Sequence, residues 1–502
     1  MRIKKLLSIA LVLLLCTKMA LVWYGFDRLP LLPNNDEAAI NDPALFLSRG
    51  EGFAAKSLAG LLRLDEVFAH YPPVYPLLQA LVYRSFGISG LTLRGSNIIF
   101  FTLYVCLLIL IFSILRKKGF LDTWAFYWVS FLLLTDPTTF YFARMGRSDS
   151  LGIFFALFSL FLLFSTKDKI RKKWIWISSG CLIGLALATH YQMISLWMTY
   201  VCIVFGIHQK QERKDALSAL AFSILTPIIL LLIVLKTEFF TGIKQVWWIY
   251  SHYQTLGLAE KCGNIFEPFK AALSGNIQVF AQKGGSAFFV IILSWGLIFS
   301  RIVYPKQADT TLLPPNGKKL LLMMGIVSLL HFFMILLVDT FTQRIISIFP
   351  AALIALGFSL SHIRRHTVRY ILNCLCAIFL VCGFIGQGYY LHKAHAEWDI
   401  RNPRRLEEFV QGIPRDKKVA AVFPFWLEFA KAHHKIRMLD TGAPGDLDAL
   451  LDGPNAINSF DLVIIFDKGD SSYQTKILES LEKYNREKIT IGLQKFIVLS
   501  KE

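Results

Sequence analysis

The chain has 502 residues, of which 55% are hydrophobic, and its 53 Lys and Arg against 35 Asp and Glu give a net charge of +18. In a soluble protein that charge would suggest nucleic acid as a partner. Here the basic residues gather in short connections between apolar runs of about 20 residues, the pattern of cytoplasmic loops in membrane proteins. The charge therefore sets membrane topology, and we expect no nucleic-acid partner.

The first apolar run, residues 6–26, follows the basic segment MRIKK. It resembles a signal peptide, but it is longer than an ordinary signal core and no small-x-small cleavage site follows it. We expect a retained membrane helix whose N-terminus is cytoplasmic, in a multi-pass protein of the cell (inner) membrane.

Ten further apolar runs bring the predicted membrane helices to about eleven. They cover residues 91–115, 123–142, 150–166, 174–189, 194–207, 216–235, 287–303, 320–338, 345–360 and 370–388. With a cytoplasmic N-terminus, every basic connection falls on the cytoplasmic side.

Two longer connections are then extracytoplasmic, a first outer loop at 27–90 and a second at 236–286. The first predicts two amphipathic helices at the membrane surface, over 43–64 and 73–86. The fold class that follows is an α-helical polytopic membrane protein with juxtamembrane helices.

The composition changes after the last apolar run. Residues 389–502 alternate short β-rich segments such as VAAVFP and DLVIIF with helical segments such as SSYQTKILESLEKY. We predict a transmembrane domain over 1–388 and a small extracytoplasmic α/β domain over 389–502, whose role the sequence does not assign.

Two acidic segments lie at the predicted outer face. Asp36 and Glu37 follow a pair of asparagines and precede a predicted helix, where carboxylates also serve as helix caps. Asp149 follows Arg147 and opens the fourth apolar run, where it could equally be an N-cap. Because one topology brings both segments to the same membrane face, we expect them to share a functional site.

Other polar residues converge on the same face. His70 and Tyr71 open the stretch HYPPVYP, whose prolines alternatively make a stiff helix entry. His190 and Arg344 lie where predicted helices meet the outer water, a position that also suits side chains reaching for solvent.

The second outer loop contains the aromatic stretch WWIYSHY, which includes Tyr250 and His252. Such a stretch is typical of an aromatic belt at the lipid headgroups. A long connection with few turn signals is also typical of a lid over a binding site.

Five motifs occur in a fixed order on this face. They are DEA at 36–38, YPP at 71–73, R-x-D at 147–149, GLALxT followed by a basic residue at 184–190, and R-x5-P at 344–350. Together they resemble the GT-C superfamily of glycosyltransferases, and within it the protein-mannosyltransferase and aminoarabinose-transferase branch. The resemblance covers residues 1–388.

The resemblance implies transfer of a hexose or pentose, with inversion, from a polyprenyl-phosphate carrier to a glycan, lipid or protein acceptor outside the membrane. A phosphate leaves as a stable anion without a general acid, whereas a hydroxyl nucleophile benefits from a carboxylate base. The family pattern assigns Asp36 as that base, with Glu37 supporting it. Asp149 would orient the acceptor or join Asp36 in holding a divalent cation.

Cations aimed at the departing phosphate would stabilise its charge. The resemblance implies this role for Arg344, His190 and Arg147, and substrate contacts for His70, Tyr71, Tyr250 and His252. In the aminoarabinose-transferase branch a lysine commonly stands at the position of Tyr71, and many relatives carry lysine at the position of His190. The sequence therefore names neither the sugar nor the acceptor.

A lipid or lipid-linked-sugar transporter is the alternative from another class. Its marks would be inverted repeats, interrupted paired spans or charges inside the spans. The apolar runs are expected to carry none of these.

Overall fold

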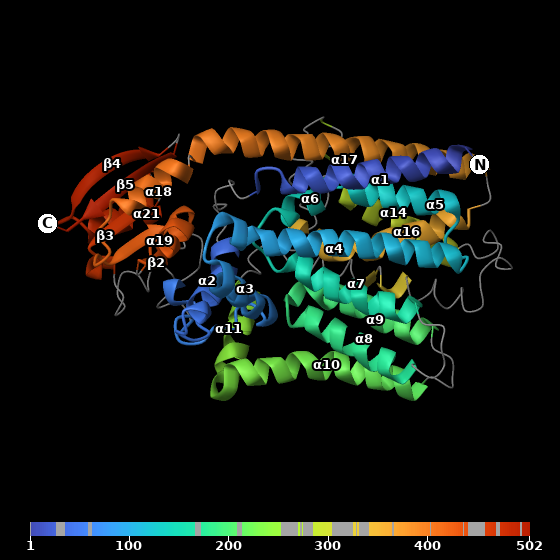
Figure 1. Cartoon of the computed structure of the whole chain (residues 1–502), viewed down its shortest axis with the longest axis horizontal. Helices are drawn as coiled ribbons and strands as arrows, with labels where there is room; N and C mark the ends of the chain where they lie inside the picture. Colours follow the sequence, from blue (N-terminus) through green and yellow to red (C-terminus); the bar gives the residue numbers. More distant parts are fainter. Residues whose placement is uncertain are drawn as a thin grey trace.

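A computed structural model gives the structure of the chain. It describes residues 2–26, 36–58, 63–165, 172–207, 213–252, 270–271, 274, 285–303, 325–327, 329–330, 341–363, 366–401, 403–434, 436–439, 457–467, 472–491 and 494–501. A bundle of long helices has a small sheet domain at one end and the N-terminus at the other, as Figure 1 shows.

The helices of the bundle follow the predicted apolar runs. They are α1 (Arg2–Trp23), α4 (Gly90–Lys117), α5 (Thr123–Thr135), α6 (Pro137–Ala143), α7 (Asp149–Ser165), α8 (Lys172–Leu187), α9 (Ile194–Ile207), α10 (Arg213–Leu235), α14 (Gly285–Val303), α16 (Phe341–Ser361) and α17 (His366–Arg401). Within the part of the chain that the structure describes, four helical stretches are long and apolar enough to cross a membrane: Ile3–Trp23, Gly90–Lys117, Lys214–Leu235 and His366–Ala396. The predicted run 320–338 lies largely outside the described residues.

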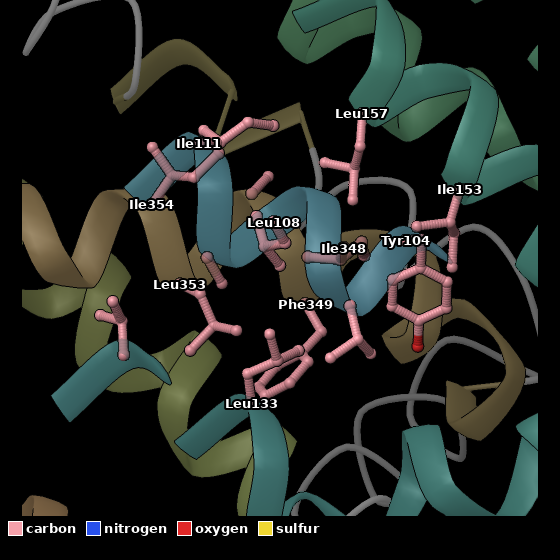
Figure 2. Packing of buried hydrophobic residues seen from close by; sticks show 14 of the residues in the cluster. Tyr104, Leu108, Ile111, Leu133, Ile153, Leu157, Ile348, Phe349, Leu353 and Ile354 are labelled. Carbon is pink, nitrogen blue, oxygen red and sulfur yellow. The ribbon is translucent and has the colours of Figure 1, made fainter. Parts of the chain in front are cut away.

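Side chains from α4, α5, α7 and α16 pack together in the bundle core, which α1, α8, α9, α14 and α17 also join. In Figure 2, Leu108 and Ile111 of α4 lie among Leu133, Leu157 and Leu353 of the other three helices, and all five side chains are buried. Because lipid is as apolar as these side chains, their association depends on close packing. The packed helices form the rigid base for the polar end of the bundle.

The predicted span 123–142 is interrupted, which corrects the sequence-based expectation. Asp136 is extended between α5 and α6, and its side chain accepts a hydrogen bond from the amide of Thr139, with Pro137 in the first turn of α6. A proline has no amide hydrogen to continue α5, so the chain begins a new helix there.

A charged residue also lies inside the bundle, contrary to the expectation of spans without charge. Lys18 of α1 is buried, and its Nζ donates to the carbonyl oxygen of Asp136 at 2.8 Å. The same ammonium lies over the rings of Phe101 and Phe140. These contacts link α1 to α4 and to the break between α5 and α6.

The first outer loop forms two helices at the polar end of the bundle. α3 (Val74–Phe86) confirms the predicted helix at 73–86. The helix predicted at 43–64 is wrong in its bounds. Instead, α2 (Asp36–Ser48) begins seven residues earlier in the chain and includes Pro43, and the short helix η2 (Lys56–Leu58) follows it. α11 (Phe239–His252) from the second outer loop lies at the same end (Figure 1).

The C-terminal part is an α/β unit, as predicted. Its sheet has the order β2-β1-β3-β5-β4, formed by β1 (Val419–Val422), β2 (Ile436–Leu439), β3 (Leu462–Phe466), β4 (Asn485–Ile491) and β5 (Gln494–Ser500). β1 pairs in parallel with β2 and β3, and β5 pairs antiparallel with β3 and β4. Among the described residues of this unit, the α-helices are α18 (Pro403–Gln411), α19 (Trp426–Lys431) and α21 (Ser472–Ser480).

This unit is joined to the rest of the chain in two ways. α17 continues through the predicted boundary at residue 388 to Arg401. The core of the sheet unit also includes Ala38 and Leu45 of α2 and Leu58 of η2. The C-terminal unit and the first outer loop therefore share one hydrophobic core.

Close packing of α8 on α10 gives a test of the bundle. A Cβ added to Gly180 would lie 2.2 Å from the carbonyl oxygen of Ala219, whereas one added to Gly296 of α14 would meet nothing within 4 Å. We expect Gly180→Ala to destabilise the protein by about 1 to 3 kcal/mol and Gly296→Ala to leave stability unchanged or slightly raised. Thermal unfolding in detergent measures both, and equal midpoints would contradict this packing.

Asp42 of α2 gives a test of the shared core. Burial raises the pKa of this carboxyl to about 6 from its ordinary value of 3.8. Between these values the folded state binds more protons than the unfolded state, so this group makes the free energy of unfolding fall as pH rises. We expect the stability of the wild type relative to Asp42→Asn to decrease from pH 4 to pH 7. A difference in thermal midpoint between the wild type and Asp42→Asn that stays constant with pH would contradict the raised pKa of Asp42.

Candidate active site

A buried ion pair opens α7. Arg147 Nε donates to Asp149 Oδ2 at 2.7 Å, and the side chains of Arg147 and Asp149 are 1% and 0% exposed. The guanidinium also lies over the ring of Phe142, 5.3 Å from its centroid. Charges buried this deeply need partners, so the pair fixes the orientation of both side chains.

His190 faces the other oxygen of Asp149. Its Nδ1 accepts a hydrogen bond from the amide of Gln192, so a neutral ring carries its proton on Nε2. Nε2 lies 3.9 Å from Asp149 Oδ1, an oxygen that accepts no hydrogen bond from the described residues. Asp149 therefore lies between a guanidinium and an imidazole.

The segment with His70 and Tyr71 is held against His190. The Tyr71 ring lies 5.8 Å from the His190 ring and 4.8 Å from the His70 ring, measured between centroids. The backbone just before them, at Ala69, bonds to the Gln245 side chain of α11 and to the hydroxyl of Tyr191. Aromatic and imidazole groups thus flank the Asp149 pair.

Glu37 ties the acidic segment to the same turn. Its Oε1 accepts from Arg94 Nε at 2.6 Å and from the amide of Gly146 at 2.7 Å, while Oε2 accepts from the Arg94 guanidinium at 2.9 Å. Asn41, one turn later, donates to the carbonyl oxygen of Gly146 at 2.6 Å. α2 is therefore fixed to the residue that precedes Arg147.

Several polar residues of this region were not singled out from the sequence. Arg94 lies inside an apolar run, and an ionisable residue in such a run is a signal that could have revealed it. Ser148, Ser150 and Gln192 are buried around Asp149, and each has a side-chain oxygen without a hydrogen-bond partner in the described parts of the chain. Ser148 and Ser150 flank Asp149 in the sequence, whereas Gln192 comes to this region through the fold.

The predicted site residues are described to different extents. Glu37, His70, Tyr71, Arg147, Asp149 and His190 form one continuous group of contacts. The side chains of the others, Asp36, Tyr250, His252 and Arg344, lie outside the described residues. Their backbones begin α2, end α11 and start α16, and α16 contacts both α7 and η3 (Tyr191–Met193).

A metal ion in this region would need several carboxylate, imidazole or thiolate ligands close together. Among the side chains that the structure describes, no group of three or more His, Cys, Asp and Glu could hold an ion. Asp36 is not among them, so a cation held by Asp36 and Asp149 stays a prediction.

Comparison with known proteins gives the same fold over the whole length. The apo structure of ArnT from Cupriavidus metallidurans superposes with a TM-score of 0.65, at 13% identity and over 98% of both chains. ArnT bound to undecaprenyl phosphate gives 0.62, at 12% identity and over 97% of both chains. The oligosaccharyltransferase AglB from Archaeoglobus fulgidus gives 0.55, at 10% identity, over 98% of this chain and 74% of AglB.

The chain has the GT-C glycosyltransferase fold. Residues 70–236 also match the family model for dolichyl-phosphate-mannose-protein mannosyltransferases. No curated protein matches the sequence. The resemblance of the five motifs to the GT-C superfamily is confirmed by this fold and by the family match.

The family match spans much of the contact group described above. His70, Tyr71, Arg147, Asp149 and His190 all fall inside residues 70–236. The α2 segment lies before the matched residues. What relates it to them in the structure is its set of contacts with the turn before α7.

Removing the charge of Glu37 tests the attachment of α2. Glu37→Gln removes the carboxylate charge from a buried pair in which both side chains are 3% exposed, and we expect a loss of about 3 to 5 kcal/mol in stability. Glu51→Gln is the matched control, because Glu51 pairs with Lys56 at the surface and contributes less than about 1 kcal/mol. Thermal unfolding compares the two, and equal shifts would contradict a structural role for the buried pair.

Proposed function

We propose that the protein transfers a sugar from a polyprenyl-phosphate carrier to a glycan, lipid or protein acceptor on the extracytoplasmic side, with inversion at the anomeric carbon. The GT-C fold supports this proposal, as do two relatives whose structures contain such carriers, ArnT with undecaprenyl phosphate and AglB with a dolichol-phosphate. The N-terminus is then cytoplasmic and the C-terminal unit extracytoplasmic, in the cell (inner) membrane.

The observation that carries the proposal is the contact between α2 and the start of α7. Glu37 and Asn41 bond to Gly146, next to Arg147. Ile40 lies one turn after the start of α2, and Leu151 lies two residues after Asp149. These two side chains pack in one hydrophobic cluster. From this attachment we infer that Asp36, the first residue of α2, shares one site with Asp149.

The division of labour follows from the reaction. Asp36 takes the proton of the acceptor nucleophile, since a hydroxyl attacks poorly without a base. Arg147, His190 and Arg344 face the phosphate, whose charge grows as the bond to the sugar breaks. Glu37, whose oxygens are used by Arg94 and Gly146, supports the position of α2.

Asp149 has a different part from Asp36. Its Oδ2 is bound to Arg147, which leaves Oδ1 to orient the acceptor or to join Asp36 on a divalent cation. Tyr71 and His70 line the approach to His190, and Tyr250 and His252 of α11 complete the substrate contacts. A sugar or lipid can use both the aromatic faces and the polar edges of such residues.

Asp36→Asn and Arg344→Ala separate the two roles. Asp36→Asn keeps the shape but removes the proton acceptor, so transfer should fall roughly 10²-fold or more while donor lipid still binds. Arg344→Ala removes a cation that faces the phosphate, so donor affinity and turnover should both fall. The total loss of binding and transition-state free energy should be about 2 to 5 kcal/mol. Donor binding and single-turnover transfer are measured in parallel, with product stereochemistry for the wild type.

Glu66→Gln is the control, since Glu66 lies in the same outer segment with its side chain half exposed. It should transfer at the wild-type rate. Near-normal transfer by Asp36→Asn, or a product that retains the anomeric configuration, would contradict the role of Asp36. Identical binding and transfer defects in the two variants would contradict the separation of base from phosphate contact.

A further inference from the structure

α2 has a second face that is turned toward the C-terminal unit. Ala38, Asp42 and Leu45 recur at intervals of four and three residues, so they form one stripe along the helix, and Arg49 follows directly after its end. Ala38 and Leu45 belong to the hydrophobic cluster that contains Trp426. The Arg49 guanidinium donates to the carbonyl oxygen of Ala430 at 2.8 Å.

Asp42 is the polar centre of this stripe. Its Oδ1 accepts from the indole Nε1 of Trp426 at 2.7 Å and from the hydroxyl of Ser57 at 2.6 Å, and its Oδ2 accepts from the Ser57 amide at 3.0 Å. Asp42 and Trp426 are 1% and 0% exposed. A buried carboxylate is costly without its donors, so this bond fixes both the rotation of α2 and its position along its axis.

A different, neighbouring face of α2 meets the candidate active site. Glu37 and Asn41 bond to Gly146, and Ile40 packs on Leu151 and Tyr75. The helix is therefore held between the C-terminal unit and the turn before α7. Asp36 lies six residues, about 9 Å along the helix, from Asp42.

We propose that Trp426 is a positioning residue for the transfer reaction, acting through Asp42 to fix α2 and with it the carboxyl group of Asp36. The inference rests on the function proposed above. It gives the C-terminal unit a part in catalysis, because its indole completes the support of a helix that starts with the base. A misplacement of about 1 Å at a reacting group can lower a rate by 10²-fold, so the effect reaches turnover even though Trp426 touches no substrate.

Trp426→Phe tests the proposal, since it keeps an aromatic ring and removes the indole N–H. We expect kcat to fall about 10-fold or more while the KM and the binding of the polyprenyl-phosphate donor stay near wild type. Trp128→Phe is the matched control, because Trp128 Nε1 donates to Asn373 Oδ1 at 2.9 Å between α5 and α17, away from α2. That variant loses an indole hydrogen bond of the same kind and should retain its kcat.

A double-mutant cycle with Asp42→Asn shows whether the effect passes through this bond. Asp42→Asn alone should lower kcat, and the double variant should be scarcely slower than the slower single variant. Ser57→Ala removes the other donor to the same oxygen of Asp42, so it should also lower kcat and leave the KM unchanged. This variant tests the proposal if Trp426→Phe does not fold. Losses that simply multiply in the cycle would overturn the proposal, as would a kcat equal to that of Trp128→Phe.

The outcome separates this inference from the proposed function. If Asp36→Asn abolishes transfer and Trp426→Phe does not affect it, the positioning role is wrong and the proposed function stands. If Asp36→Asn transfers normally, the proposed function fails, and any effect of Trp426 then has another cause.

Discussion

The candidate site depends on one buried ion pair, between Glu37 at the start of α2 and Arg94 in α4. Glu37 also accepts the Gly146 amide, so the pair joins the first outer loop, the membrane bundle and the turn before α7. A Cβ at Gly146 would lie 3.1 Å from Glu37 Oε1 and 2.8 Å from the Leu93 carbonyl oxygen, so a glycine allows this approach. Together with the Asn41 bond to Gly146, the pair fixes α2 relative to the turn that leads to Asp149.

The polar end of the bundle is built by supporting contacts as much as by the residues that face substrate. Arg147 is held by Asp149 and Phe142, and the segment before His70 is held by Gln245 and Tyr191. Side chains whose orientations are fixed in this way need little reorganisation when charge develops on a phosphate. The C-terminal unit extends the same support to α2.

The sequence predicted the parts that depend on local pattern. Apolar length placed the helices, and alternation of short segments predicted the C-terminal α/β unit. Glu37, His70, Tyr71, Arg147, Asp149 and His190 do lie in one region, while their roles and the side of the membrane stay predictions. The predictions were wrong where a single residue decided the outcome, as at the break before Pro137 and the start of the helix at Asp36.

The sequence could not predict contacts between distant positions. Glu37 and Arg94 are 57 residues apart, and Asp42 and Trp426 are 384 residues apart, so no periodicity relates them. Lys18 was hidden for a similar reason, because its partner is a backbone carbonyl exposed by the helix break. Such polar contacts are selected by the tertiary fold and leave only a weak local signal.

An experimental structure with a bound polyprenyl phosphate would test the central claim, that the acidic segment of α2 and the Arg147–Asp149 pair form one site. The account predicts the phosphate beside Arg147 and His190, with the carboxyl groups of Asp36 and Asp149 within about 15 Å of each other, a span that one substrate can bridge. A larger separation, or a phosphate bound away from this pair, would contradict it.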